Sequence, residues 1–421
     1  MSQSTSEPLG KDRDFRIYIG GRTVTELGSR ITREGLPIVA VLAAGATAQD
    51  LGYMAALGYV VALLVAPAAG VLSDRGRRRP LLIAADIARA GLLLSITLAA
   101  ALHRLSFSEM LLVFGLVTGV SVLFEVADQA FLPDFAGRSR LEAANAAVST
   151  ASAIGETGGP ALMGTLIQTL GGPLAIGVDA VTYLVSALSL GLIRRKEPPA
   201  ARAEAAGSMR QALQGAQALL RHPLLRLLAI AVGMQSLGGG FYDSLYEFYA
   251  LRELHQSPFA IGLLITAGGL GALVAAPLAP RIARRLGTGP ALAAGAALYG
   301  LVTLLVPFAP PVPLLGFLFL LGAQLFGDAS YTVFAFGEAV LRQSATPGPW
   351  LGRITGSVRF LGNLVGALGA LAAALLAGSF GVRAALFLAS ALMLAAVPFL
   401  LAAPVLRQRR PPAPDPAHFA G

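Results

Sequence analysis

The chain of 421 residues contains no cysteine, which excludes a disulfide framework, a thiolate metal centre and a cysteine nucleophile. Its four histidines are scattered without the spacing of metal ligands, so no metal site is expected. Lysine occurs only at Lys11 and Lys196, and neither lies in a glycine-rich phosphate-binding loop. We therefore expect neither an enzyme nor an ATP-driven pump, and no cofactor.

Charge is also scarce. Charged residues make up 13% of the chain and hydrophobic residues 55%, whereas a soluble domain carries roughly 25% charged residues. The apolar residues form twelve continuous segments, each long enough to cross about 30 Å of hydrocarbon as a helix. Continuous runs favour helices over barrel strands, whose hydrophobicity alternates. The segments span about residues 17–43, 51–73, 81–101, 108–131, 142–169, 174–193, 224–250, 258–279, 290–309, 313–340, 352–378 and 382–404.

The basic residues are distributed unevenly. The net charge is +9, but most Lys and Arg lie in the termini and in every second loop, while the alternate loops hold only Arg104, Arg252 and Arg383. This is the positive-inside pattern, which places both termini in the cytoplasm and argues against nucleic acid as a partner. The first fifteen residues show no signal peptide. An arginine-, alanine- and glycine-rich composition favours a bacterial genome, so we expect a monomeric, multi-pass protein of the bacterial inner membrane.

A polar stretch divides the chain. Residues 194–222 begin with Arg-Arg-Lys-Glu-Pro-Pro and predict a cytoplasmic linker with a surface helix. The flanking halves match weakly at an offset near 210, where Pro67 corresponds to Pro277 and Arg75 to Arg285. We expect an N-terminal tail at 1–15, six-helix bundles at 16–193 and 223–406, and a C-terminal tail at 407–421.

Two motifs resemble those of a known family. The loop after the second segment reads Gly-Val-Leu-Ser-Asp-Arg-Gly-Arg-Arg-Arg from Gly70, and it resembles the G-x-x-x-D-R-x-G-R-R signature of the major facilitator superfamily, with Arg77 where glycine is usual. The resemblance implies a cytoplasmic conformational latch formed by Gly70, Asp74, Arg75, Arg78 and Arg79, joined by Asp128 of the fourth segment. The alternative is a plain topogenic arginine run.

The second motif lies in the fifth segment, where Gly155 to Gly164 resembles the antiporter signature G-x-x-x-G-P-x-x-G-G of drug exporters. Gly155, Gly159, Pro160 and Gly164 match, and Met163 replaces one glycine. Small residues on one face allow close helix packing, and the proline bends the helix. Ordinary small-residue packing is the alternative. The resemblance implies two six-helix bundles around a central cavity, and an exporter of the drug, macrolide or siderophore type.

Ionisable side chains within the apolar segments are functional candidates by default, because each costs at least about 2.5–3.5 kcal/mol in hydrocarbon. The first segment spaces Arg22, Glu26, Arg30 and Glu34 four residues apart, which predicts one shared face of alternating charge. Arg33 adds an unmatched positive charge. Either the set neutralises itself along a cavity, or Arg30, Arg33 and Glu34 bind an anionic group or a proton.

The remaining candidates lie in other segments. Glu125 is three residues from Asp128, and Asp86 is three from Arg89, so the latter two are expected to pair. An Asp328–Arg359 pair is a further hypothesis. Three consecutive glycines from Gly238 predict a break in the seventh segment, and its later tyrosines and acids form either an interfacial belt or a cavity wall. The predicted substrate and proton residues are Arg30, Arg33, Glu34, Glu125, Glu156, Asp243, Tyr246, Asp328 and Arg359.

The sequence thus predicts an all-α membrane protein of twelve helices that exports a small molecule in exchange for protons. Its partners would be that substrate, protons and the bilayer. Two alternatives stay open: proton-coupled or facilitated uptake on the same fold, and a sensor or scaffold that transports nothing. Substrate identity is beyond the sequence.

Overall fold

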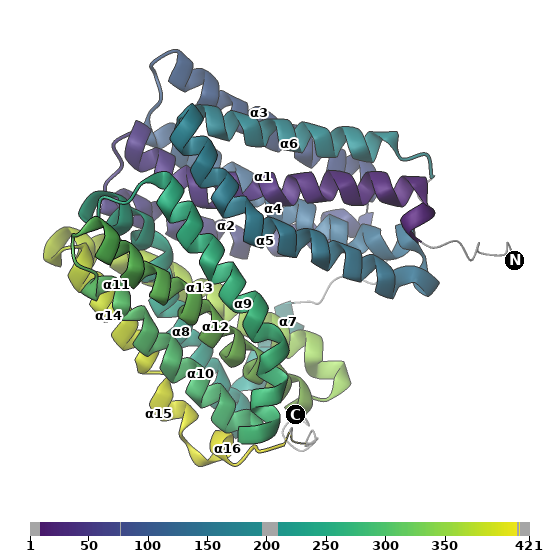
Figure 1. Ribbon diagram of the computed structural model, residues 1–421. Helices are drawn as coiled ribbons and strands as arrows, with labels where there is room; N and C mark the ends of the chain where they lie inside the picture. The colour runs from purple at the N-terminus through teal and green to yellow at the C-terminus, as the bar shows by residue number, and fades with distance from the viewer. Residues whose placement is uncertain (1–8, 76, 196–208, 411, 413–421) are drawn as a thin grey trace, which may run out of the picture. The chain divides into compact units, whose positions relative to one another are not determined.

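The structure is a computed structural model that describes residues 9–75, 77–195, 209–410 and 412. Every regular element of this described part is helical (Figure 1). Ten helices are long and apolar enough to cross a membrane. The prediction of an all-α, multi-pass membrane protein is therefore supported.

The first half of the chain forms six long helices. They are α1 (Arg13–Ala43), α2 (Ala48–Arg75), α3 (Arg78–Ala101), α4 (Phe107–Ala136), α5 (Leu141–Leu170) and α6 (Gly172–Leu192). Short 3₁₀ turns at Leu9–Lys11 and Arg138–Arg140 precede α1 and α5.

The second half begins with the amphipathic α7 (Met209–Arg221), which packs on α13. The long helices that follow are α8 (Pro223–Phe248), α9 (Pro258–Leu286), α10 (Thr288–Thr303), α12 (Pro313–Ala345), α13 (Gly348–Phe380) and α14 (Val382–Leu394). Short elements complete it: a π turn at Tyr249–Glu253, α11 (Leu305–Phe308), α15 (Val397–Leu400) and α16 (Ala403–Leu406).

Contacts divide the chain into two compact units. Unit 1 comprises residues 1–45 and 64–206, and unit 2 comprises residues 46–63 and 207–421. The first part of α2 therefore packs with the second half of the sequence, which the sequence did not indicate. The expected boundaries at 16–193 and 223–406 remain a prediction, and residues 196–208 of the linker lie outside the described part.

Helix packing repeats between the units. In unit 1, α1 packs along α5 and α6, and α3 along α4 and α6. In unit 2, α8 packs along α13 and α14, and α10 along α12 and α14. These pairs correspond at the offset of about 210 residues, so the weak sequence repeat is a repeat of packing.

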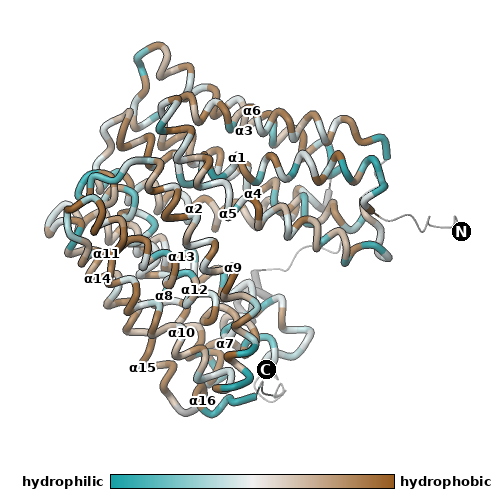
Figure 2. Tube along the Cα trace, viewed as in Figure 1, coloured by the Kyte–Doolittle hydropathy of each residue, from teal (hydrophilic) through white to brown (hydrophobic). Residues whose placement is uncertain are grey.

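Two long helices, α1 and α5, do not meet the apolar criterion that the ten others satisfy. Both are long enough to span about 30 Å, with 31 and 30 residues at 1.5 Å each. Polar stretches interrupt α1 along its length (Figure 2). The two helices pack against each other, and Arg30 of α1 pairs with Glu156 of α5.

The predicted break at the three glycines of the seventh segment is wrong, because α8 runs through them without interruption. Two of them serve close packing instead. A Cβ at Gly240 would lie 2.8 Å from the backbone nitrogen of Ala370 on α13, and one at Gly238 would lie 2.6 Å from Cγ of Met393 on α14. A Cβ at Gly239 would meet nothing within 4 Å.

Asp12 joins three segments at the start of α1. Its carboxylate accepts from the backbone N–H of Asp14 at 3.1 Å and of Phe15 at 3.3 Å, which caps the helix. It also accepts from Arg140 at 3.3 Å and Arg195 at 2.9 Å. Partial burial raises the pKa of Asp12, but the Phe15 N–H and the two guanidiniums outweigh it and hold the pKa below its usual value.

We expect Gly240→Ala to destabilise unit 2, because the methyl group has to displace backbone of α13. Overpacking of this kind costs about 1–3 kcal/mol. Gly239→Ala is the matched control, and should be neutral or stabilising because alanine favours helix by up to about 1 kcal/mol. Thermal unfolding of the detergent-solubilised protein measures both, and equal melting temperatures would contradict the packing.

Asp12 should stabilise the fold in a pH-dependent way. Its folded pKa is lowered, so its contribution is fully present above the unfolded value of about 3.9 and is lost as pH falls through the folded value. Asp12→Asn should therefore lower the melting temperature at neutral pH, and the difference from the parent should vanish in acid. A difference that persists below about pH 3 would show that ionisation of Asp12 is irrelevant.

Candidate functional site

The charged residues of α1 form two separate ion pairs. Arg22 bonds to Glu26 at 3.1 Å, and Arg30 bonds to Glu34 at 3.1 Å. The predicted self-neutralising ladder is confirmed in these pairs, but it does not follow one face. At about 100° per residue, a four-residue step drifts by about 40°, so the ladder turns from the α4 side of α1 toward α5.

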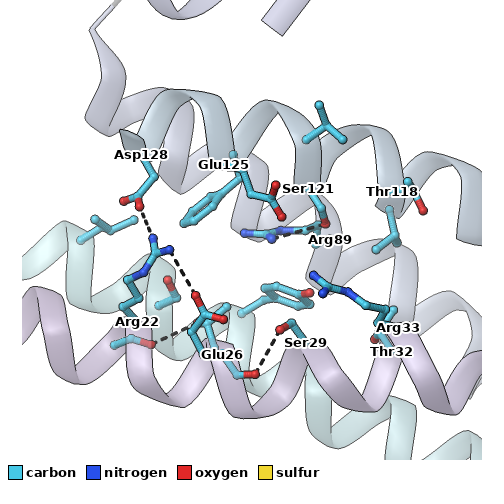
Figure 3. Close-up of a pocket in the computed structure, with 18 of the residues that line it drawn as sticks. Arg22, Glu26, Ser29, Thr32, Arg33, Arg89, Thr118, Ser121, Glu125 and Asp128 are labelled. Carbon is cyan, nitrogen blue, oxygen red and sulfur yellow. Dashed lines mark hydrogen bonds and ion pairs between the residues drawn. The ribbon is translucent and has the colours of Figure 1, made fainter. Parts of the chain in front are cut away.

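Each arginine of the ladder also binds an acid on another helix. Arg22 pairs with Asp128 of α4, which in addition accepts a 2.8 Å hydrogen bond from the Tyr18 hydroxyl. Arg30 pairs with Glu156 of α5 at 3.1 Å. The result is two acid–arginine–acid triads, Glu26–Arg22–Asp128 and Glu34–Arg30–Glu156, and Figure 3 shows Arg22 between its two acids.

Each triad has one carboxylate more than it has cations. With both acids ionised each triad carries a net charge of −1, and a bound proton or a cationic group removes that charge. Glu34 has a buried oxygen, Oε2, without a hydrogen-bond partner, whereas the Glu156 side chain is 61% exposed. The second triad therefore joins a buried acid to an accessible one.

The glycines of the antiporter-like motif make the second triad possible. A Cβ at Gly155 would lie 2.8 Å from both Cβ and the carbonyl oxygen of Glu26, and one at Gly159 would lie 2.7 Å from Cβ of Arg30. Pro160 and Gly164 are buried on the same helix. The small size of Gly155 and Gly159 lets α5 approach the charged turn of α1 closely.

A cavity of about 250 Å³ lies within unit 1, between α1, α3, α4 and α6. Arg22, Glu26 and Arg33 line it from α1, and Glu125 and Asp128 line it from α4. The cavity thus adjoins the first triad, whereas Arg30 and Glu34 lie outside its wall. Figure 3 shows the side chains converging on this space.

Arg89 of α3 lines the cavity and is held in place by several contacts. Its guanidinium carbon lies 4.2 Å from the ring centres of both Phe124 and Tyr183, so the cation is held between two aromatic faces. It pairs with Asp86, as predicted, and contacts the Ser121 hydroxyl at 3.5 Å. Both members of the pair are buried, with Arg89 4% exposed and Asp86 fully buried.

The structure revises the predicted latch. Asp128 contacts Arg22 and Tyr18 rather than the loop arginines, because α1 places the Arg22 guanidinium beside the Asp128 carboxylate. Arg78 instead pairs with Asp134 at the end of α4, and Arg79 donates to the carbonyls of α6 at Leu190. Gly70 lies in α2. The side chains of Asp74 and Arg75 lie outside the described part, so the latch stays a prediction.

Unit 2 brings together fewer of the predicted residues. Asp243 accepts a hydrogen bond from the Tyr59 hydroxyl of α2, and Tyr246 is buried and stacks on Tyr242 at 5.7 Å. Burial of Tyr246 argues against an interfacial belt at that position. Asp328 lies against Gly268 of α9, and Arg359 is exposed, so the Asp328–Arg359 pair stays a prediction.

Two buried acids were missed. Asp179 of α6 is fully buried and accepts from the hydroxyls of Thr32 and Thr182. Glu338 of α12 bonds to Arg342 at 2.7 Å. Asp179 was identifiable as an ionisable residue in an apolar segment, and Glu338 with Arg342 as an acid–base pair four residues apart.

Comparison with known proteins gives a consistent result. A family model described as Major Facilitator Superfamily matches residues 27–250 and 228–421. The chain is 24% identical to the uncharacterized MFS-type transporter YfiS of Bacillus subtilis (strain 168), covering 89% of this chain and 90% of YfiS. It is 23% identical to the multidrug efflux pump Tap of Mycolicibacterium fortuitum, covering 83% and 86%.

Solved structures share the fold. A bacterial homologue of the iron transporter ferroportin, in its inward-facing state, superimposes with a TM-score of 0.74 at 17% identity, covering 93% of this chain and 98% of the homologue. The nucleoside transporter NupG gives a TM-score of 0.74 at 12% identity, covering 92% and 99%. Identities this low support the fold and nothing finer.

The first triad predicts an asymmetric response to neutralisation. Arg22→Gln leaves Asp128, whose side chain is 5% exposed, without its cation, and breaking a buried pair in this way costs about 3–5 kcal/mol. Asp128→Asn should cost less, because Arg22 keeps Glu26. Thermal unfolding at neutral pH measures both, and the double variant Arg22→Gln/Asp128→Asn should recover much of the loss. If Asp128→Asn is as damaging as Arg22→Gln, Arg22 is not the shared partner that the geometry indicates.

Proposed function

Because the chain belongs to the Major Facilitator Superfamily, we propose that it is a secondary transporter that exports a small molecule from the bacterial cytoplasm in exchange for protons. In this proposal its twelve spanning helices form two six-helix bundles that rock about a central site. Gly70, Asp74, Arg75, Arg78 and Arg79 latch the cytoplasmic side, and both termini are cytoplasmic. No bound cofactor is needed, since the proton gradient supplies the energy.

The exchange for protons in this proposal is supported above all by the Glu34–Arg30–Glu156 triad. One guanidinium shared by two carboxylates leaves one excess negative charge, which a single proton neutralises. Glu156 is accessible while Glu34 has an unpartnered buried oxygen. A proton that enters at Glu156 therefore has a second acid available through the same arginine, and Glu34 is the carboxyl that gains most from protonation.

The α5 glycines support antiport by linking this site to helix motion. Gly155 and Gly159 place the α5 backbone against Glu26 and Arg30 of α1, because neither glycine has a side chain of its own to hold the helices apart. A change in the charge of the triad therefore acts directly on the contact between α1 and α5. The motif resembles that of drug exporters, and a multidrug efflux pump is among the relatives, which together favour export over uptake.

Transport by inverted membrane vesicles tests the proposal. With an imposed gradient, acid inside, export appears as substrate accumulation within the vesicles. The panel comprises lipophilic cations, macrolides and siderophores. One proton per substrate supports about tenfold accumulation per pH unit, because about 1.4 kcal/mol corresponds to a factor of ten.

Glu34→Gln should abolish gradient-driven accumulation while leaving gradient-independent substrate exchange. Glu142→Gln, an exposed acid in the first turn of α5, is the matched control and should behave like the parent. Parental accumulation by both Glu34→Gln and Glu156→Gln would refute the triad as the proton site. Accumulation by energised right-side-out vesicles would establish uptake instead, and no transport of any substrate by the folded protein would favour a sensor or scaffold.

A further inference from the structure

We propose that the cavity of unit 1 is the binding site for a small zwitterion, whose carboxylate binds Arg33 and whose ammonium binds Glu125. This assignment rests on the proposed function as a transporter, and it narrows the substrate class. It is independent of transport direction and of the coupling ion.

Six charged side chains among the described residues line the cavity. Arg22 is neutralised by two acids, and Arg89 is paired with Asp86 and held between aromatic rings. Arg33 and Glu125 are different: both line the cavity, both are exposed, and neither has a hydrogen bond or ion pair with any described residue. One unpaired cation and one unpaired anion thus face the same space.

These two charges lie on different walls. Arg33 projects from α1, and Glu125 projects from α4, as Figure 3 shows. A ligand with a single charge pairs with only one of them and leaves the other without a counter-charge. A ligand that carries both a carboxylate and an ammonium satisfies both, and the guanidinium fork suits the carboxylate end.

The rest of the wall suits a small ligand with an apolar body. Phe114 and Phe124 contribute rings, and Thr118 and Ser121 contribute hydroxyls on the same helix as Glu125. The volume of about 250 Å³ is below the roughly 300–1,000 Å³ of drug-sized sites. The cavity therefore accommodates a molecule of the size of an aromatic amino acid.

The test is a set of four probes that share the phenylalanine skeleton and differ in the charge at its two ends. Phenylalanine carries both charges, N-acetylphenylalanine only the negative one, phenylalaninamide only the positive one, and N-acetylphenylalaninamide neither. Calorimetric binding to the full-length protein in nanodiscs is measured at about pH 6.5, where an α-amino group of pKa about 7.7–8.0 is protonated. We expect phenylalanine to bind tightest, with each blocked probe weaker by about tenfold or more, since each lacks one charge-assisted contact.

Substitutions at Arg33 and Glu125 test which residue binds each end of the probe. Arg33→Gln should bind phenylalanine and phenylalaninamide equally, and Glu125→Gln should bind phenylalanine and N-acetylphenylalanine equally. Arg33→Lys and Glu125→Asp keep the charges and should keep the discrimination, which separates recognition from a folding defect. The controls Arg104→Gln and Glu142→Gln replace exposed charges that do not line the cavity and should bind as the parent does.

Equal binding of the four probes by the parent, or discrimination that survives in Arg33→Gln and Glu125→Gln, would overturn the assignment. So would failure of every probe to bind a protein that transports in vesicles, in which case the proposed function stands and the zwitterion site falls. Specific binding of phenylalanine without proton-driven transport would retain the site and remove the antiport mechanism.

Discussion

The sharing of one arginine by two carboxylates on α1 is the constraint from which the rest of unit 1 follows. A helix with five charges between Arg22 and Glu34 is too costly to leave against lipid. Neighbouring helices therefore have to supply partners, and α4 does so with Asp128 and α5 with Glu156. The α5 partner reaches Arg30 only because Gly155 and Gly159 remove the side chains that would keep the two backbones apart. The glycine motif and the charge ladder are thus two parts of one contact.

The same constraint explains why two halves with similar packing differ in chemistry. At the offset of 210, the ladder residues Arg30 and Glu34 correspond to Gly240 and Ser244 of α8, and Gly240 uses its small size to approach α13. Asp128 corresponds to Glu338, and both are buried acids paired with an arginine. The repeat has therefore kept the helix contacts and one acid near the end of the fourth helix of each half. The charged cavity described above lies in the first half.

The sequence predicts the helices well because the hydrophobicity of each segment depends on whether that segment crosses the bilayer, and not on which helices surround it. It also predicts the pairs that lie within one helix, such as Arg30 with Glu34, because helix geometry fixes their spacing. The sequence does not predict which side chains pair between different helices. Asp128 was expected to bind loop arginines, yet it pairs with Arg22 of α1, because which helix faces which depends on side-chain packing over the whole unit. The break expected at Gly238 to Gly240 failed for the same reason, since the partner helices that those glycines accommodate cannot be seen from α8 alone.

The two proposed sites meet on a single turn of α1. Arg33 and Glu34 are adjacent, so their side chains leave the helix about 100° apart: Arg33 lines the cavity, and Glu34 bonds to Arg30, which bonds to Glu156 of α5. A ligand that draws Arg33 toward α4 pulls on the same backbone turn that α5 holds through Arg30. Loss of a proton from the triad strengthens that hold, because both carboxylates then attract the one guanidinium. We infer that ligand and proton act on neighbouring residues of one helical turn, so coupling between them requires no longer pathway through the protein.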